Sequence, residues 1–435
     1  MRRWLCAALV LLCACGGASE NGDGRPPNIV LIIGDDHGYG DFGFMGSEIA
    51  HTPNLDRLAV GGALFPSAYS TASVCRPALR SLLTGLHPVQ FDLREQLLIR
   101  HGIPASPKTP LRDHFHTLPT LLAEQGYTSF QSGKFQEGSY GNAGFSHGMT
   151  LTVGKAGRKQ GTVIARETME PLFSFIDANL EQPFFVWFAP QLPHLPHNAP
   201  KEFRTRYESL GLPWWAPRYY ANVTWFDAAV GDLLHHLEER GVRDRTLIVY
   251  LADNGWQAPG PGIEYDSVLG GHQGKMSLYE AGFRTPVLFN WPGRIPAGAR
   301  RDDLVSIVDL FPTLLDYAGA PPSANPDRPG VDLREILEGN PAPLRSELIG
   351  TAGTLRSDRD GEPRGGSFLR TQRWHYLWYN DGREALFDLE ADPDEKRDVA
   401  AQHPGVTQTS RERIRRWKKR MVESVASVPN TSARF

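Results

Sequence analysis

Continuous apolar runs constrain the fold of this chain more than any other feature of its sequence. They occupy residues 28–33 (NIVLII), 183–188 (PFFVWF) and 246–251 (TLIVYL). A strand with one face in water alternates apolar and polar side chains, whereas a strand buried on both faces is apolar throughout. The three runs therefore predict interior strands of a parallel sheet, and residues 128–130 (TSF) predict a shorter strand.

Helical patterns lie between these runs. Residues 118–125 and 219–240 carry apolar side chains at helical spacing, and Gly241 is a stop signal for the second segment. Residues 285–289 predict a further strand, and residues 305–318 predict a helix after it. Strands that alternate with helices predict an α/β fold, with a large mixed, mostly parallel sheet flanked by helices.

The pattern of apolar and polar residues changes near Ile349. Shorter alternating runs, such as residues 368–370 and 375–379, predict a small C-terminal antiparallel sheet. A basic segment, residues 409–424, predicts a helix that closes this sheet. We therefore expect a large α/β domain over residues 28–345 and a C-terminal subdomain over residues 346–435.

The composition excludes other classes of protein. Of the 435 residues, 40% are hydrophobic and 22% are charged, which is ordinary for a globular protein and too apolar for a disordered one. A net charge of −3 provides no global basic field for DNA or RNA. We therefore expect no nucleic-acid partner.

The N-terminus has the pattern of an export signal. Arg2 and Arg3 precede an apolar segment, residues 4–12, that is too short to span a bilayer. The adjoining LCACG at residues 12–16 is similar to a bacterial lipobox, in which Cys15 becomes the lipidated first residue.

This pattern predicts a lipoprotein signal and lipobox at residues 1–15, followed by a flexible tether at residues 16–27 (GGASENGDGRPP). We expect an exported protein that is lipid-anchored to the bacterial membrane, faces the periplasm or cell surface, and meets the membrane only through its anchor. A plain secretory signal cut after Ala14 or Ala18 is the alternative.

The four cysteines then reduce to one in the folded body. Cys6 and Cys13 leave with the signal, and Cys15 carries the lipid, so Cys75 alone remains. A single unpaired thiol in an exported protein needs a reason for its presence.

Charged or ligating side chains follow the predicted strands. Listed by strand they are Asp35 and Asp36, Lys134, His194, and Asp253 with Asn254. Ligands of an open parallel sheet bind at the carboxyl ends of its strands. Each residue taken singly also fits an ordinary turn or helix cap, but their coincidence at one edge predicts a functional site.

The oxygen donors in this set indicate the kind of metal. Asp35, Asp36, Asp253 and Asn254 offer only hard oxygen ligands, which suit Ca²⁺ or Mg²⁺ and do not suit zinc. Three crowded carboxylates would also repel one another strongly without a cation.

Cys75 precedes Pro77, a residue favoured in the first turn of a helix. Its thiol would therefore lie at a helix N-terminus, where negative charge is stabilised. The alternative is an inert thiol that packs as a small hydrophobic residue.

Further short motifs accompany these residues. They are DDHGYGD at 35–41, TPNLDRL at 52–58, CRP at 75–77, LLTG at 82–85, SGK at 132–134, ADNG at 252–255, GK at 274–275 with Glu280, and LFDLEADP at 386–393. With them the chain resembles a type I, formylglycine-dependent sulfatase of the alkaline-phosphatase superfamily, from Pro27 to about Val399.

The resemblance implies an alkaline-phosphatase-like fold and a sulfuric ester hydrolase. It implies that a maturation enzyme converts Cys75 to formylglycine. It also implies that this residue and the four oxygen ligands bind one Ca²⁺ ion, with Mg²⁺ as the alternative. It also implies that Lys134, His194 and Lys275 contact the sulfate.

The implied chemistry explains why a bare cysteine would not serve. A hydrated aldehyde carries two hydroxyls on one carbon, so one can attack sulfur and the other can re-form the carbonyl and expel sulfate. A thiolate could attack but could not eliminate sulfate in this way. A protonated His194 or Lys275 could donate to the departing alcohol.

Two positions depart from the family pattern. Where the family has arginine four residues after the cysteine, this chain has Leu79, and Arg80 or Arg76 would have to take that role. Where the family has histidine two residues after the lysine of SGK, this chain has Gln136. Candidates to replace that base are His37, His147 and His272, each of which also fits an ordinary surface or supporting histidine.

Three functions fit these residues. The first is a sulfatase acting on a sulfated carbohydrate or a similar small ester, and the second is a phosphodiesterase or phosphonate hydrolase of the same superfamily. The third is a sulfated-glycan-binding lipoprotein without turnover. An aromatic group (Trp214, Trp215, Tyr219 and Tyr220) could stack on sugar rings or pack in the core, and packing is the more ordinary role.

Overall fold

The computed structural model describes residues 25–100, 102, 104, 109–152, 160–257, 273–321, 328–340, 344–352 and 365–426. The predicted signal and lipobox, residues 16–24 of the tether, and His272 lie outside the described residues. Within these ranges no helix combines the length and the apolar composition needed to cross a bilayer.

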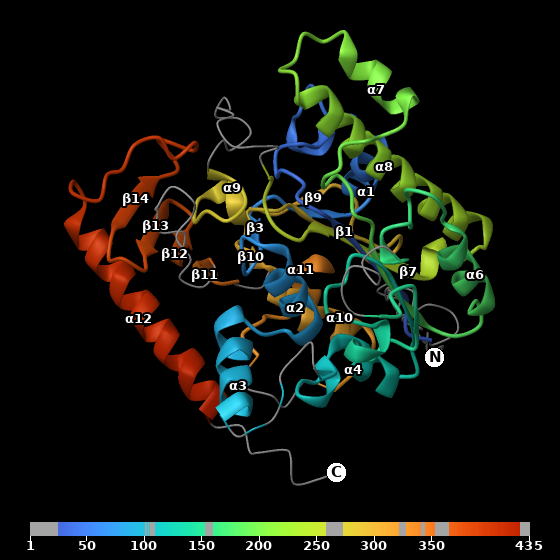
Figure 1. Cartoon of the computed structure of the whole chain (residues 1–435), viewed down its shortest axis with the longest axis horizontal. Helices are drawn as coiled ribbons and strands as arrows, with labels where there is room; N and C mark the ends of the chain where they lie inside the picture. Colours follow the sequence, from blue (N-terminus) through green and yellow to red (C-terminus); the bar gives the residue numbers. More distant parts are fainter. Residues whose placement is uncertain are drawn as a thin grey trace, which may run out of the picture.

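A mixed, mostly parallel sheet forms the centre of the larger domain (Figure 1). In the described part of the chain it has eight strands, in the order β5-β4-β6-β1-β7-β8-β2-β9. Their bounds are β1 Asn28–Gly34, β2 Ala63–Phe65, β4 Thr128–Gly133, β5 His147–Gly148, β6 Phe184–Ala189, β7 Thr246–Ala252, β8 Val287–Asn290 and β9 Ala299–Arg300. The strands from β5 to β7 are parallel, and β8 is antiparallel to β7 and to β2. The predicted fold class is confirmed.

The apolar runs form strands because both faces of the sheet are covered. In β1, Ile29, Leu31 and Ile33 pack into the core on one face, whereas Val30 and Ile32 pack into the core on the other. The first face is covered by α2 Cys75–Thr84, α4 Leu118–Glu124, α10 Leu310–Tyr317 and α11 Arg334–Leu337, and the second by α1 Pro53–Val60, α6 Glu170–Ala178 and α8 Ala216–Glu239. Other helices are α3 Pro88–Arg100, α7 Lys201–Glu208 and α9 Glu280–Phe283.

Strand order brings the predicted site together. The neighbours β4, β6, β1 and β7 are parallel, so their carboxyl ends lie at one edge. The residues that follow these four strands are therefore neighbours in space, although they are far apart in the sequence.

The predicted helix at residues 305–318 is partly wrong. Val305–Ser306 forms β10, which pairs in parallel with β3 (Ala68–Tyr69), and regular helix begins only at Leu310. The Asp309 carboxylate accepts a hydrogen bond from the Ser306 backbone N–H at 2.8 Å and so fixes the turn between strand and helix. Hydrophobic periodicity alone does not reveal this local capping.

The C-terminal part forms the expected antiparallel sheet and helix. The strands β11 Glu347–Ala352, β12 Gly366–Thr371, β13 Trp374–Tyr379 and β14 Glu384–Asp388 pair in sequence order. α12 (Pro404–Ala426) runs along this sheet at the edge of the molecule, where Ile414 and Trp417 pack against Leu369 and Tyr376 (Figure 1). The domain limits at residues 28–345 and 346–435 stay a prediction.

A buried ion-pair network joins the two parts. Glu280, at the start of α9, accepts hydrogen bonds from Tyr69 Oη at 2.8 Å and from Arg370 Nε of β12 at 3.1 Å. The Glu280 backbone N–H donates to the Glu395 carboxylate at 2.7 Å. Burial raises the pKa of Glu280, but the Arg370 and Arg284 guanidinium groups outweigh that effect and hold it below its usual value.

We expect Glu280→Ala to lower the free energy of unfolding by about 3–5 kcal/mol, because it leaves a buried guanidinium without its partner. Denaturant unfolding measures this change. Asp394→Ala, which removes the exposed pair between Asp394 and Lys396, is the control and should cost about 1 kcal/mol or less. Equal losses of stability for the two substitutions would contradict a stabilising role for the buried ion-pair network around Glu280.

Candidate active site

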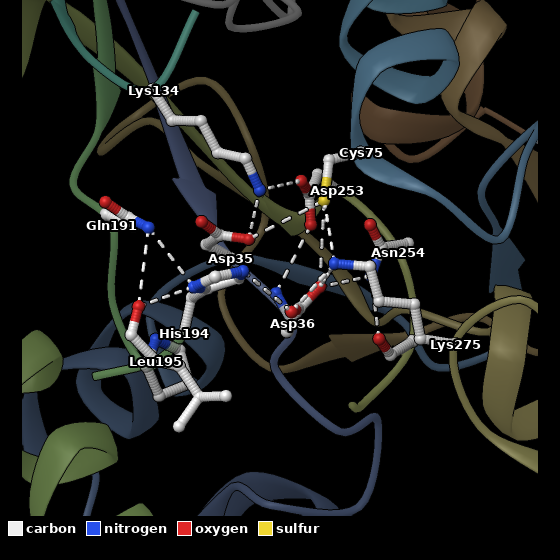
Figure 2. A network of polar contacts seen from close by, with 12 residues as sticks. Asp35, Asp36, Cys75, Lys134, Gln191, His194, Leu195, Asp253, Asn254 and Lys275 are labelled. Carbon is white, nitrogen blue, oxygen red and sulfur yellow. Dashed lines mark hydrogen bonds and ion pairs between the residues drawn. The ribbon is translucent and has the colours of Figure 1, made fainter. Parts of the chain in front are cut away.

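Three carboxylates and one thiol meet at the carboxyl edge of the sheet (Figure 2). Ligand atoms of Asp35, Asp36, Cys75 and Asp253 all lie within 4.8 Å of one another, and all four residues are buried. Asp36 has a positive φ of 58°, a conformation that few residues other than glycine adopt and that aspartate tolerates better than most. Its backbone N–H donates to Asp253 Oδ1 at 3.3 Å, which ties the end of β1 to the end of β7.

Two lysines offset this negative charge. Lys134 Nζ contacts Asp35 Oδ1 and lies 3.1 Å from Asp253 Oδ2. Lys275 Nζ lies 2.6 Å from Asp36 Oδ1 and 2.9 Å from Cys75 Sγ. Each ammonium group is therefore placed between carboxylates or between a carboxylate and the thiol.

A close backbone approach sets the position of Lys134. Gly133 has a φ of 80°, and a Cβ atom there would lie 1.9 Å from the carbonyl oxygen of Ala189. The Lys134 N–H donates to that same carbonyl at 2.6 Å. Only glycine fits between β4 and β6 at this point, which explains the SGK motif.

Burial and neighbouring charges shift the ionisation of the cluster. Burial raises the pKa of Asp35 to about 6, against the opposing effect of Lys134. Burial also acts to raise the pKa of Asp36, but Lys275 and Lys134 outweigh it and hold that pKa below its usual value. Burial and the Asp253 charge raise the pKa of Cys75 well above its ordinary value.

Cys75 is the first residue of α2, as the sequence predicts. Its Sγ lies 3.9 Å from Asp35 Oδ1 and 3.8 Å from Asp36 Oδ1. The carboxylates thus counteract the helix N-terminus, and the raised pKa keeps the thiol protonated at neutral pH. Because the thiolate is the nucleophilic form, an unmodified cysteine is a poor nucleophile here.

The loop after β6 holds His194 beside Asp36. His194 Nε2 lies 3.4 Å from Asp36 Oδ2, and Nδ1 lies 2.6 Å from the Leu195 carbonyl oxygen. Nδ1 is therefore the nitrogen that donates to this carbonyl, which leaves Nε2 directed at the cluster. Asn222 of α8 fixes the loop, since its side-chain amide donates to the carbonyls of Pro193 and Pro196 at 3.2 and 3.1 Å.

The oxygen atoms of the cluster fit a hard divalent cation. Asp35 Oδ2 and Asn254 Oδ1 are buried, and neither has a hydrogen-bond partner among the residues that the structure describes. A buried polar oxygen without a partner is costly, and a cation would satisfy both atoms. The predicted ligands Asp35, Asp36, Asp253 and Asn254 are thus brought together with Cys75 (Figure 2).

Known protein families match almost the whole folded chain. The family model for sulfatases matches residues 27–320. The chain belongs to the sulfatase family. A second model, "N-sulphoglucosamine sulphohydrolase, C-terminal", matches residues 270–422. The protein is therefore a sulfuric ester hydrolase of the alkaline-phosphatase superfamily.

Curated relatives cover most of this sulfatase. It is 30% identical to N-acetylgalactosamine-6-sulfatase of Canis lupus familiaris over 412 residues, which cover 84% of this chain and 76% of the relative. It is also 30% identical to arylsulfatase A of Homo sapiens over 419 residues, which cover 85% and 78% of the two chains.

Solved structures agree with the fold. The structure of Ps i-CgsB in complex with k-i-k-neocarrahexaose matches with a TM-score of 0.72 and 26% identity, covering 91% of this chain and 93% of that one. Phosphonate monoester hydrolase of Agrobacterium radiobacter matches with a TM-score of 0.67 and 20% identity, covering 91% and 96%. The second likeness concerns the fold alone.

Arg80 of the sulfatase, a predicted catalytic residue, is engaged away from the carboxylate cluster. Its guanidinium lies 2.9 Å from Glu137 Oε2 and 2.8 Å from Glu95 Oε1. Arg76 Nε lies 3.1 Å from Glu137 Oε1. Among the described residues, no hydrogen bond or ion pair joins Arg80 to Cys75 or to the carboxylates of the cluster.

Two of the candidate replacement histidines, His37 and His147, do not join the cluster either. His37 is fully buried, with its ring nitrogens 3.0 Å from the Asp41 carbonyl oxygen and 3.1 Å from Tyr250 Oη. Burial lowers the pKa of His37 to about 3, so it is a neutral core residue. His147 is exposed on the edge strand β5. Gln136 has a φ of 66°, and its side chain forms no hydrogen bond with any described residue.

The aromatic group mostly packs in the core. Trp215, Tyr219 and Tyr220 are buried, and the two tyrosine hydroxyls donate to the Asp41 carboxylate at 2.7 and 3.1 Å. Trp214 alone is open to solvent, with 71% of its surface exposed.

Sequence reasoning missed Glu137 and Asn222. Glu137 is fully buried and accepts hydrogen bonds from two arginines of α2. Its position three residues after Lys134, together with two arginines after Cys75, was the available signal. Asn222 offered no signal, because its role depends on the path of a distant loop.

We expect Arg80→Leu to lower the free energy of unfolding by about 3–5 kcal/mol, because it leaves a buried carboxylate with one partner fewer. Arg76→Leu, at a half-exposed position, is the control and should cost about 1 kcal/mol. Thermal and denaturant unfolding measure both changes. If Arg80→Leu preserves stability and loses turnover instead, Arg80 contacts the substrate and the structural role is wrong.

Proposed function

We propose that this sulfatase hydrolyses sulfate esters of a sulfated carbohydrate, through a formylglycine formed from Cys75 and a bound Ca²⁺, with Mg²⁺ as the alternative. One observation carries the proposal: a buried thiol lies within hydrogen-bond distance of Lys275 and close to two carboxylates. Such a thiol is a poor nucleophile, whereas the hydrated aldehyde derived from it supplies a hydroxyl that can attack sulfur.

The substrate class is supported by the relatives. N-acetylgalactosamine-6-sulfatase is named for a sulfated sugar, and Ps i-CgsB is in complex with a carrahexaose. Both names point to carbohydrate esters, and we extend this class of substrate to the present chain.

The oxygen donors would hold the cation. Asp35, Asp36, Asp253 and Asn254 supply the ligand atoms, and the modified Cys75 would add a fifth. A bound divalent cation would neutralise charge on the sulfate and on the crowded carboxylates.

The side chains around Cys75 divide the remaining work. Lys275 Nζ donates to Cys75 Sγ, and Lys134 Nζ donates to Asp35 Oδ1. Both ammonium groups therefore lie near the thiol, where they are placed to bind sulfate oxygens. His194 has its Nδ1 proton fixed by the Leu195 carbonyl, so Nε2 can carry a second proton beside Asp36 and deliver it to the departing alcohol.

Phosphoester or phosphonate hydrolysis is the second candidate, favoured by the similar fold of phosphonate monoester hydrolase. A panel of aryl sulfates and aryl phosphate esters separates the two activities. Faster turnover of the phosphate esters would overturn the sulfatase proposal, and no turnover of either by a fully matured protein would favour a glycan-binding role.

Cys75→Ala should abolish turnover while the folded state stays intact, because the substitution removes only the sulfur atom. Mass spectrometry of the Cys75 peptide from the unsubstituted protein measures the fraction converted to formylglycine. Turnover, assayed on the same preparations, should rise with that fraction. Full activity of a preparation whose Cys75 is entirely unmodified would contradict the mechanism. Conversion needs a maturation enzyme. Export by the lipoprotein signal at residues 1–15, with lipid anchoring to the bacterial membrane, belongs to the same proposal.

Added Ca²⁺ should raise the melting temperature of the chelator-treated protein. At 100 times the Kd, binding to the folded state alone stabilises by about 2.7 kcal/mol. Asp253→Asn should remove this response, whereas Asp394→Asn, at an exposed carboxylate, should keep it. Absence of any cation response in the unsubstituted protein would contradict the metal site.

A further inference from the structure

A second group of arginines lines a cavity far from Cys75. The cavity has a volume of about 420 Å³ and lies between α12 and the residues that lead into β11. Its lining residues are Arg345, Ser346, Glu347, Arg413, Arg416 and Arg420. Residues of an α-helix turn by about 100° each, so the three arginines of α12 lie within one narrow stripe.

The charges of this cavity do not cancel. Arg345 lies 2.7 Å from Asp309 Oδ2, and Arg413 lies 2.7 Å from Glu347 Oε2. Arg416 and Arg420 are exposed, and neither forms a hydrogen bond or an ion pair within the described residues. The chain as a whole has a net charge of −3, so this local excess of positive charge is not a general property of its surface.

A second cavity, of about 330 Å³, shares Arg345, Glu347 and Arg420 with the first. Trp417 and His87 form part of its wall, with their rings 5.1 Å apart. His87 Nδ1 is buried and has no partner among the described residues. Paired and unpaired guanidinium groups, an aromatic wall and an unsatisfied ring nitrogen thus line two neighbouring cavities with shared wall residues, which we call the arginine cleft.

The arginine cleft is separate from the catalytic cluster. Cys75 is the first residue of α2, whereas His87 lies just beyond the last turn of that helix. A helix of ten residues is about 15 Å long, so the length of α2 separates the two sites. α12 lies at the edge of the molecule, next to α3 (Figure 1).

We propose that this arginine cleft binds a sulfate group of the sulfated glycan at a position distant from the ester that is hydrolysed. The inference rests on the proposed function for the identity of the polyanion. Guanidinium groups form paired, charge-assisted hydrogen bonds with oxyanions, and Arg416 and Arg420 are free to make them. Binding at a second sulfate would hold a long chain on the enzyme between successive reactions.

A glycan fits the cleft better than a membrane surface does. Trp417 is buried, with only 7% of its surface exposed, so it cannot insert into lipid. Among residues 404–425 of α12 the exposed large apolar residue is Val422, which is turned by about 200° from Arg420. Over residues 404–425 the exposed part of this face therefore offers cationic contacts, and no large apolar side chain that is exposed there faces the cleft.

The test uses the full-length protein and dextran sulfate as the probe. The variant R416S/R420S removes both unpaired arginines and should weaken dextran sulfate binding by about tenfold, for the loss of two charge-assisted contacts. The matched control is R415S/K419S, which removes the same charge at the same spacing but about 100° around the helix. It should weaken binding by no more than about twofold, which corresponds to a small screened charge effect.

Kinetics provide an independent readout. Neither double variant touches the catalytic cluster, so both should hydrolyse a monomeric aryl sulfate at the rate of the unsubstituted protein. With a sulfated polysaccharide, R416S/R420S should raise KM and leave kcat unchanged. If the protein hydrolyses no sulfate ester but still binds dextran sulfate through Arg416 and Arg420, the proposed function is rejected and the binding role of the cleft stands.

Two results would overturn the inference. Equal weakening by both double variants would show a non-specific charge effect. Binding to vesicles of anionic phospholipid that depends on Arg416 and Arg420, without a matching effect on dextran sulfate, would assign the cleft to the membrane instead.

Discussion

Crowding of three buried carboxylates is the constraint on which the rest of this site depends. Asp35, Asp36 and Asp253 lie so close together that their ionised forms repel strongly, and burial adds a desolvation cost. The folded state balances them with the ammonium groups of Lys134 and Lys275, which arrive from opposite sides (Figure 2). Two cations against three ionised carboxylates leave the cluster net negative, which favours the binding of a divalent cation.

The sheet makes this crowding possible at acceptable cost. Four adjacent parallel strands end at the same edge, so each needs only one or two polar residues beyond its last apolar position. The strands are rigid because both faces are buried, and the loops that follow are tied down individually. Gly133 permits the contact that aims Lys134, and Asn222 holds the loop of His194. Precision at the site is therefore a property of the scaffold as much as of the site residues.

Much of this arrangement could be predicted from the sequence, because it depends on local patterns. Apolar runs identify the interior strands, and the polar residues after them identify the carboxylate cluster. The local pattern places Cys75 only at a helix start, and it was the family resemblance that joined Cys75 and Lys275 to the cluster. What could not be predicted depends on contacts between distant segments. The short strand at Val305 exists because Ala68 pairs with it, and Glu137 becomes buried only when α2 packs against the loop after β4. From the sequence alone, the arginines of α12 resemble an ordinary solvated helix face. They line a cavity because the segment before β11 packs beside them.

The departure at Leu79, with Arg80 one position later, acquires a physical meaning from Glu137. A buried glutamate needs cationic partners, and Arg80 and Arg76 both turn to it. Their positive charge is thereby used in holding α2 against the loop after Lys134, and is withdrawn from the neighbourhood of Cys75. At the thiol itself the contacting cation is Lys275, and Lys134 acts on it through Asp35. Under the proposed mechanism, chemistry at Cys75 would therefore draw its charge stabilisation from these lysines, His194 and a bound metal, rather than from an arginine of the helix that begins at Cys75.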